Sequence, residues 1–416
     1  METFERLESA VRSYSRSWPT VFASARGHTL TDENGNDYLD FFSGAGTLNY
    51  GHNPPELKQT LIEYIESDGV THGLDMATVA KRDFLERFDE VILRPRGLEY
   101  RVQFPGPTGT NAVEAALKVA RKATGRELVL HFTNGFHGMT LGSLAVSANL
   151  AKRAGAGVPL SHTMTMPYDG FLGENVDTVA QIEMHLKSGG GGVDLPAAVI
   201  VETVQGEGGL HAASFEWLSR LRALCDRFGV LLILDDIQVG CGRTGPFFSF
   251  EPAGIVPDII CLSKSLSGYG LPLALTLIRP ESDAWEPGEH SGTFRGNNPA
   301  FVTATKALDF WTNDALSRDV DRKAQTMTAG LLEIAARFPE AQASLRGRGM
   351  IQGLCCGVPG LAKAATDAAF ERGLIVETSG PESEVVKLLP ALTIDDAALD
   401  EGLAVIADSL EAALSG

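Results

Sequence analysis

Lys264 has the type and position of a residue that could do covalent chemistry. It lies in the segment PDIICLSKSLSGYGLP, just after the apolar run 258–262 and among small residues. A primary amine forms an imine with an aldehyde, and a partly desolvated lysine is the usual source of that amine in a protein. A single lysine in a serine-rich loop is more often a solvated surface charge. Its interpretation therefore depends on the residues that accompany it.

Two carboxylates follow another apolar run in LLILDDIQVGCGRTG, which spans residues 231–245. Burying a carboxylate costs several kcal/mol unless a cation or hydrogen-bond donors meet it, so Asp235 needs a partner. A protonated pyridine nitrogen would serve, because the carboxylate would hold the proton that makes such a ring an electron sink. Capping a turn or pairing with Arg243 explains Asp235 equally well in isolation. Asp236 is expected in a hydrogen-bond network, and Gln238 within reach of a ring hydroxyl.

A third element is the turn Thr108, Gly109 and Thr110, which precedes a strong helical pattern over 110–124. Free N–H groups and the positive end of the helix dipole would face an anion such as a phosphate at this turn. The alternative is that Thr110 only caps the helix. The glycines do not form the G-x-G-x-x-G pattern of a dinucleotide site.

The elements that would position these residues alternate between strand and helix through the middle of the chain. Unbroken apolar runs, typical of parallel strands covered on both faces, occur at 128–132, 197–202, 230–235 and 258–262. Ligands of such sheets bind at the carboxyl ends of the strands. The lysine, the carboxylate and the glycine turn are therefore expected at one edge of one sheet.

The two ends of the chain differ from this middle. The cluster DENGN within residues 28–42 predicts a hairpin, and the segment after Phe310 is helical, then strand-like, then helical again. The last helix has one apolar face, formed by Leu399, Leu403, Ile406, Leu410 and Leu414. We predict an α/β fold with a large domain over 56–310, built on a mostly parallel sheet, and a smaller α+β domain over 311–416 to which 1–55 contributes. The glycine-rich stretch 188–192 is predicted to be a flexible surface loop.

Composition limits the partners. The formal net charge of -18 disfavours nucleic acid and anionic membrane surfaces. No stretch reaches the roughly 20 apolar residues that span a bilayer, and the histidines and cysteines show no metal-ligand spacing, so no metal site is predicted. An odd number of five cysteines does not describe a disulfide framework, which favours the cytoplasm.

Together these motifs resemble the class III aminotransferases, pyridoxal-phosphate enzymes of fold type I, the aspartate-aminotransferase fold. The most specific match is the run D-[ED]-hydrophobic-Q-x-G-x-G-R-x-G at 235–245, and the resemblance covers nearly the whole chain. It implies that Lys264 carries the cofactor as a Schiff base and acts as the catalytic base. It also implies that Asp235 meets the pyridine nitrogen.

Other family motifs assign further residues by resemblance. An aromatic-His-Gly motif stands at 136–138, so that Phe136 and Ile237 would hold the two faces of the ring, with His137 beside it. The phosphate turn of the family corresponds to 108–110. The motif E-x-x-Q-G-E gives Glu202 near the cofactor, and Glu207 as the residue that helps switch between amino donor and acceptor.

The motif T-[FY]-x-G-N stands at 293–297. In the family its threonine, Thr293 here, reaches the phosphate held by the neighbouring subunit. The resemblance therefore implies a homodimer or a larger homo-oligomer with shared active sites.

Within the family, stretches such as GAGTLNYGHN, FHGMTLGSLAVS and ETSGPESEVVKLLPALTI resemble the branch that forms L-2,4-diaminobutyrate in ectoine biosynthesis. This implies amino transfer from L-glutamate to L-aspartate 4-semialdehyde. It also implies a potassium requirement, although no residue pattern marks a potassium site.

One position departs from the family. Many relatives have an arginine before the C-terminal h-x-P-P-L run that binds the substrate carboxylate, whereas this chain has Lys387. Lysine lacks the bidentate fork of arginine, so the grip on a carboxylate would differ. Arg295, where relatives often have glycine, is a candidate replacement.

Three other functions stay open on the sequence. Another class III aminotransferase, acting on ornithine, 4-aminobutyrate or siderophore-linked diaminobutyrate, is the first alternative. A cofactor-binding regulator without catalysis is disfavoured by the intact Asp235, Gln238 and Lys264. A nicotinamide dehydrogenase is disfavoured by the missing dinucleotide fingerprint.

Overall fold

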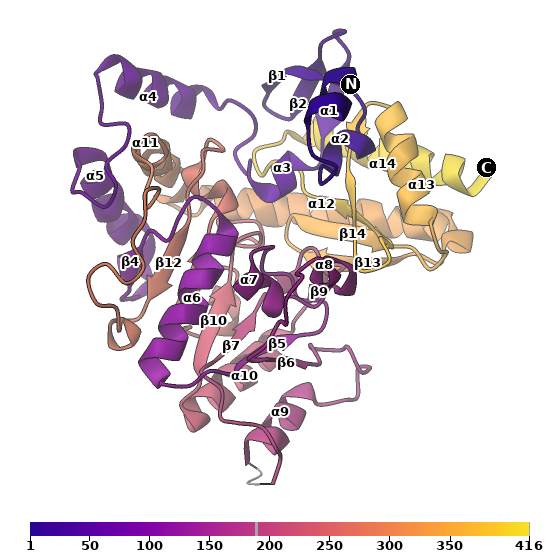
Figure 1. Cartoon of the computed structure of the whole chain (residues 1–416). Helices are drawn as coiled ribbons and strands as arrows, with labels where there is room; N and C mark the ends of the chain where they lie inside the picture. The colour runs from indigo at the N-terminus through magenta and orange to yellow at the C-terminus, as the bar shows by residue number, and fades with distance from the viewer. Residues whose placement is uncertain (188–189, 416) are drawn as a thin grey trace.

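A computed structural model describes residues 1–187 and 190–415, and Figure 1 shows the whole chain. Its centre is a seven-stranded sheet in the order β4-β12-β11-β10-β7-β5-β6. The strands are β4 (Arg101–Gln103), β5 (Val129–Phe132), β6 (Thr163–Met166), β7 (Ala198–Val201), β10 (Leu231–Asp235), β11 (Ile259–Leu262) and β12 (Leu275–Ile278). The strands from β6 to β11 are parallel, which confirms the predicted sheet, whereas β12 runs antiparallel to both β11 and β4.

Two hydrophobic cores cover the two faces of this sheet. On one face Ile233 packs with Val113 of α6 (Gly109–Thr124), and on the other Leu232 and Leu234 pack with Leu221 of α10 (Phe215–Phe228). Side chains alternate between the faces of a strand, so a strand covered on both sides needs an apolar residue at every position. This is why the predicted strands have unbroken apolar sequences.

Helix α6 begins one residue earlier than its pattern predicts. Its N-cap is Thr108, not Thr110, and Thr108 forms a capping box with Asn111. The helix ends at Gly125, which has the left-handed conformation (φ 65°) expected of a glycine stop. The interpretation of Thr110 as the cap is therefore wrong, and its hydroxyl instead forms hydrogen bonds with the hydroxyls of Thr140 at 2.6 Å and Ser143 at 2.9 Å.

Segments from both ends of the chain form the second part of the molecule. One sheet has the order β13-β14-β17-β16, and another has the order β1-β2-β3-β15. Their strands are β1 (Phe22–Arg26), β2 (Thr29–Asp32), β3 (Asp37–Asp40), β13 (Ser344–Arg348), β14 (Ile351–Cys355), β15 (Leu374–Ile375), β16 (Glu377–Ser379) and β17 (Val385–Leu388). The hairpin predicted within 28–42 is confirmed by the antiparallel pair β2 and β3.

Strand β3 also pairs in parallel with β15, where Leu39 lies opposite Leu374. In Figure 1 the indigo N-terminal segment accordingly lies beside the yellow C-terminal elements. Three helices accompany these sheets: α12 (Ala315–Arg337), α13 (Leu361–Glu371) and α14 (Asp396–Ser415), the last with its predicted apolar face largely buried. The exact domain boundaries at 55/56 and 310/311 stay a prediction.

The remaining elements are short or peripheral. They are α1 (Glu2–Leu7), α2 (Tyr14–Ser17), α3 (Ser43–Gly46), α4 (Pro55–Glu66), α5 (Val79–Phe88), α7 (Leu141–Ala145), α8 (Leu150–Ala154), α9 (Thr178–Lys187), α11 (Asn298–Ala307), β8 (Val204–Gln205) and β9 (His211–Ala212). Among the helices of the described residues, none is both long and apolar enough to cross a membrane. The loop predicted at 188–192 lies partly outside the described residues, since 188 and 189 are not among them.

Candidate active site

Lys264 lies just beyond the carboxyl end of β11 and begins a short 3-10 turn, Lys264–Ser267. Its φ is 44°, a left-handed conformation that costs a residue with a Cβ some free energy and that clusters at functional sites. Burial, which outweighs the attraction of Glu207, lowers the pKa of the Lys264 ammonium. A larger fraction of this lysine is thus the neutral amine, the form that attacks a carbonyl.

Asp235 is the last residue of β10, and its side chain is almost completely buried. One carboxylate oxygen, Oδ2, lies 2.7 Å from Nδ1 of His137, and the other accepts the backbone N–H of Ile237 at 3.2 Å. Burial alone would lower the pKa of the His137 imidazole, but the hydrogen bond and charge of Asp235 outweigh burial and raise it. The pair therefore fixes the carboxylate at the end of the strand.

The pairing of Asp235 with Arg243, considered from the sequence, is wrong. Arg243 is fully buried. It donates to the carbonyls of Met350 and Pro390 and, at 2.6 Å, to Oδ1 of Asn49. Its role is to tie the glycine-rich loop to the C-terminal and N-terminal parts of the chain.

Asp236 points away from Asp235 into a hydrogen-bond network, as expected. It accepts the backbone N–H of Ser249 at 3.1 Å and also the Ser249 hydroxyl. Burial nevertheless raises the pKa of Asp236 to about 7. The neighbouring buried carboxyl of Glu202, which accepts the N–H of Phe136 at 2.9 Å, likewise has its pKa raised by burial to about 7.

These residues converge on one cavity of about 170 Å³, which we call the catalytic cavity. It is lined by Gly109, Thr110, Phe136, His137, Gly138, Glu202, Glu207, Asp235, Ile237, Gln238 and Lys264. The parallel pairing of β10 with β11, in which Asp235 lies opposite Cys261, explains why Asp235 and Lys264 emerge at the same edge. Thr108 is not among the lining residues, because its exposed side chain is used in capping α6.

Lys387 lies in β17 with a completely buried side chain. Its Nζ is 2.8 Å from Oε1 of Glu207 and 2.7 Å from Oε1 of Glu377. Burial alone would raise the pKa of Glu207, but the ammonium of Lys387 outweighs burial and holds it well below its usual range. Glu377 was not singled out in the sequence, although it lies directly opposite Lys387 in the β16–β17 pair. The register of these two strands was the signal that could have found it.

Two predicted site residues do not line the catalytic cavity of a single chain. Thr293 is exposed to solvent. Arg295 lines a different cavity of about 210 Å³, together with Trp285 and His290. The chain by itself therefore does not bring these two residues to the catalytic cavity.

The sequence and the fold are similar to those of known proteins. Residues 11–410 match the family model "Aminotransferase class-III". The chain belongs to the class III aminotransferases. A diaminobutyrate–2-oxoglutarate transaminase of Streptomyces anulatus is 60% identical over 408 residues, covering 98% of this chain and 97% of that protein. One of Halalkalibacterium halodurans is 58% identical over 412 residues, covering 99% of this chain and 96% of that protein.

Solved structures give the same fold. The ornithine aminotransferase of Toxoplasma gondii superposes with a TM-score of 0.86 at 26% identity, covering 100% of this chain and 94% of that one. An S-selective transaminase from Arthrobacter sp. has a TM-score of 0.89 at 21% identity, covering 100% and 98%, and shows likeness of fold alone. The predicted fold type I architecture is thereby confirmed.

Pyridoxal phosphate is the cofactor of this class III aminotransferase, and the catalytic cavity fits it. Gln238 is 7% exposed, and its Oε1 has no hydrogen-bond partner among the described residues, so it can accept a bond from a ring hydroxyl. At the N-terminus of α6, a Cβ on Gly109 would lie 3.0 Å from the Ile237 side chain, so glycine allows the helix end and the ring wall to approach each other. An amine, a buried carboxylate and a helix N-terminus are the three groups that this cofactor needs.

Proposed function

We propose that this aminotransferase moves the amino group of L-glutamate to L-aspartate 4-semialdehyde, giving L-2,4-diaminobutyrate and 2-oxoglutarate. The observation that carries the proposal is the parallel register that delivers Lys264 and the His137-bound Asp235 to one cavity. The names of relatives that are 58% and 60% identical support the choice of substrates. By the same resemblance, the reaction is the first dedicated step of ectoine biosynthesis.

In the proposed mechanism Lys264 has two roles. Its amine anchors the cofactor and, once displaced by the substrate amine, moves the proton at the substrate carbon that bears the amino group. Bound pyridoxal phosphate supplies a ring that withdraws electrons from that carbon. Burial lowers the pKa of Lys264, which suits a group that must both accept and return a proton.

The other cavity residues hold and polarise the cofactor in this proposal. Asp235 keeps the ring nitrogen protonated, and His137 fixes the orientation of that carboxylate at 2.7 Å. Phe136 and Ile237 would lie on the two faces of the ring. The N-terminus of α6, with Gly109 and Thr110, would bind the phosphate.

The substrate carboxylate has two candidate partners. In the first, Glu207 moves aside when glutamate binds, so that Lys387 is free to bind the carboxylate. Lys387 would still have Glu377 at 2.7 Å, which weakens its attraction for a second anion. In the second, Arg295 of a neighbouring copy supplies the charge. We expect the Michaelis constant for glutamate to rise about tenfold in the variant that removes the true partner, Lys387→Ala or Arg295→Ala. An unchanged value for Arg295→Ala removes Arg295 from the proposal.

We further propose a homodimer, or a larger assembly of dimers, in which Thr293 and Arg295 serve the site of the partner copy. Supporting this, Phe294 is 62% exposed and contacts the ring of His72, next to exposed apolar side chains of the 70–79 segment. Mixing Lys264→Ala protein with Arg295→Ala protein under exchange conditions should restore activity, because one site of each mixed dimer is then intact. No recovery from exchanged subunits would count against a shared site.

The decisive experiment is identification of the products after incubation of the protein with glutamate and aspartate semialdehyde. Stoichiometric 2,4-diaminobutyrate and 2-oxoglutarate support the proposal. A clear preference for the aldehydes of ornithine or 4-aminobutyrate metabolism would replace it with another class III activity. A protein that fails to change its absorbance with glutamate would be a cofactor binder without catalysis.

Two further parts of the proposal rest on resemblance and composition. Potassium is proposed as an activating ion, tested by replacing potassium with sodium in the assay. No group of three or more metal-ligating side chains occurs in residues 1–187 and 190–415. The cytoplasm is proposed as the location, and five cysteines that are all unpaired suit a reducing compartment.

A further inference from the structure

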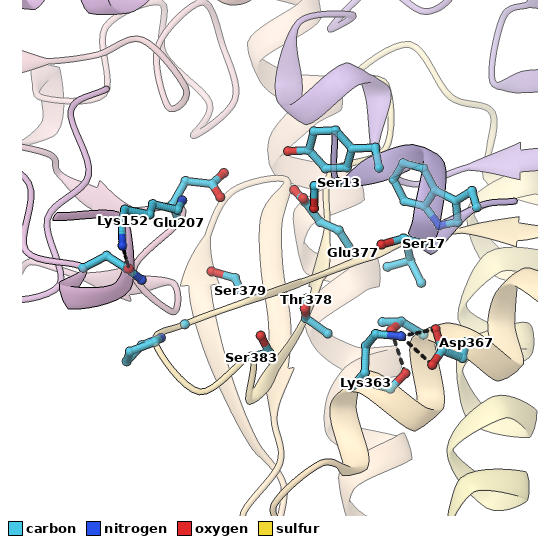
Figure 2. A pocket seen from close by; sticks show the side chains of 17 residues that line it. Ser13, Ser17, Lys152, Glu207, Lys363, Asp367, Glu377, Thr378, Ser379 and Ser383 are labelled. Atoms are coloured by element: carbon cyan, nitrogen blue, oxygen red, sulfur yellow. Dashed lines mark hydrogen bonds and ion pairs between the residues drawn. The ribbon is translucent and has the colours of Figure 1, made fainter. Parts of the chain in front are cut away.

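A second cavity, of about 390 Å³, adjoins the catalytic cavity because Glu207 lines both. We call it the outer pocket. Figure 2 shows that three distant segments build it: Lys152 and Glu207 come from one side, the Glu377–Ser379 strand from the other, and the N-terminal segment with Ser13 and Ser17 closes over them. A substrate whose reacting end lies at Lys264 would extend its other end into this space.

One wall of the outer pocket carries surplus negative charge. Glu207 and Glu377 both pair with the single ammonium of Lys387, so two carboxylates share one ion-paired cation. Lys264, the other cation that acts on both, would be used by the cofactor in the proposed function. Burial, which outweighs the nearby Lys387, raises the pKa of Glu377. The Glu377 side chain is only 10% exposed, and its Oε1 has the ion pair with Lys387 but no hydrogen bond among the described residues.

The wall is also held in place. The Ser379 hydroxyl donates to the carbonyl of Gly206 at 2.7 Å and accepts the N–H of Gly209 at 3.1 Å. The N–H of Gly380 donates to the carbonyl of Glu207 at 3.2 Å. These bonds join strand β16 to the loop that carries Glu207, so the two carboxylates form one preorganised acidic wall.

An unneutralised cation lies on the same side of the pocket as Glu207, facing the Glu377–Ser379 strand. Lys152, in α8, has its Nζ 4.1 Å from the centre of the Phe136 ring, and no ion pair joins it to a carboxylate among the described residues. The other lysine of the pocket, Lys363, is paired with Asp367 at 2.5 Å. Lys152 is therefore the lining cation whose charge is available to a ligand.

We propose that the outer pocket recognises the α-amino acid end of L-aspartate 4-semialdehyde and of its product, with the α-carboxylate on Lys152 and the α-ammonium against Glu377 and Glu207. The inference rests on the proposed function, since the C4 end of the molecule must then lie at Lys264. One free cation and one surplus anion in the same pocket match the two charges of a zwitterion, and neither charge is required by a simple aldehyde.

Three amines distinguish the contact of the carboxylate with Lys152 from the contact of the ammonium with Glu377 and Glu207. L-2,4-diaminobutyrate carries both groups, 4-aminobutyrate is the same chain without the α-ammonium, and 1,3-diaminopropane is the same chain without the carboxylate. Each is added to cofactor-loaded protein, and the second-order rate of the absorbance change is measured. Calorimetric binding of diaminobutyrate to cofactor-free protein gives a readout that does not depend on turnover.

Lys152→Met keeps the length of the side chain over Phe136 and removes its charge. It should lower the second-order rates of reaction with diaminobutyrate and 4-aminobutyrate by about tenfold or more, and it should leave the rate with 1,3-diaminopropane unchanged. Binding of diaminobutyrate to the cofactor-free protein should weaken by a similar factor. Lys363→Met is the matched control, and it should leave the ratios among the three amines unchanged because Asp367 already neutralises Lys363.

Glu377→Gln should lower the rates of diaminobutyrate and 1,3-diaminopropane and spare 4-aminobutyrate. If this variant does not fold, the wild-type protein decides the same point, since 4-aminobutyrate should react at least about tenfold more slowly than diaminobutyrate. Equal losses for all three amines, or none, overturn the assignment. A wild-type protein that makes no diaminobutyrate would instead refute the proposed function, so the two failures are distinguishable.

Discussion

The catalytic cavity and the acidic wall beside it are built in contrasting ways. The reacting residues of the cavity follow consecutive strands of one parallel sheet, where Asp235 ends β10 and Lys264 follows β11. The wall joins Glu207 of the large sheet region to Lys387 and Glu377 from near the C-terminus. The first arrangement comes from local order along the chain, and the second exists only when distant segments pack together. Changes in the cavity should therefore affect chemistry, whereas changes in the wall should affect stability and selectivity.

Replacing Lys264 with alanine should have the largest effect. The variant should bind the cofactor but lose turnover by about three orders of magnitude or more, because no other amine in the catalytic cavity can move the proton. Single-turnover absorbance with glutamate measures this loss. Borohydride reduction followed by peptide mapping should label Lys264 in the wild-type protein, and a label elsewhere would refute its role as anchor.

Asp235→Asn should have the next largest effect. The amide keeps the shape of the side chain but cannot hold the ring proton by charge, so we expect a slower half-reaction by about a hundredfold and weaker retention of the cofactor. Stopped-flow absorbance and equilibrium dialysis measure the two effects. Asp236→Asn is the matched neighbour, because its side chain points to Ser249, and it should retain the cofactor.

Lys387→Met tests the wall. It leaves Glu207 and Glu377 buried without their shared cation, which should destabilise the fold by about 3–5 kcal/mol. The shift in the urea midpoint of cofactor-free protein measures this loss. The surface pair of Lys363 and Asp367 is the control, since breaking an exposed ion pair should change the midpoint little. A small shift for Lys387→Met would mean that the wall is not a coupled buried cluster.

The smallest expected effect is on the pH dependence of stability. Burial raises the pKa of Asp236 from its ordinary value of 3.8 to about 7. A carboxyl group whose pKa is raised on folding stabilises the fold fully at a pH below its pKa in the unfolded chain. This stability is lost as the pH rises through its pKa in the folded protein. The thermal midpoint should therefore contain a term that falls between about pH 4 and pH 7, and Asp236→Asn should remove the share of Asp236 and leave that of Glu202, whose pKa burial also raises to about 7. An equal slope in both proteins would assign the effect to another group.

The difference between residues positioned by their neighbouring sequence and residues positioned by tertiary packing explains how much could be predicted from the sequence. Apolar runs with a carboxylate or a lysine at their ends revealed the parallel strands and the reacting residues. They could be recognised because each reacting residue directly follows its strand along the sequence. The antiparallel strands β4 and β12 were not predicted. Strand β4 has three residues at the edge of the sheet, whereas β12 is a buried four-residue strand between β4 and β11 whose apolar run was missed.

Other misses have specific physical reasons. The cap of α6 is Thr108 because only Thr108 can form the capping box with Asn111, which two threonines in the same turn do not reveal. Arg243 was considered a partner of Asp235, but its buried carbonyl acceptors lie more than a hundred residues away along the chain. Glu377 and Lys152 acquire significance only from strand register and from a cavity wall, which depend on tertiary packing.

The pairing of β3 with β15 has a consequence for synthesis of the protein on the ribosome. Most of the large sheet, including β10 and β11, has been translated before β15 emerges, so the nascent chain can assemble the edge that carries Asp235 and Lys264 early. The N-terminal hairpin must wait for its last strand partner, and Glu377 and Lys387 are added only after it. A chain released prematurely before residue 374 would therefore keep its reactive amine while lacking the wall that selects what reaches it.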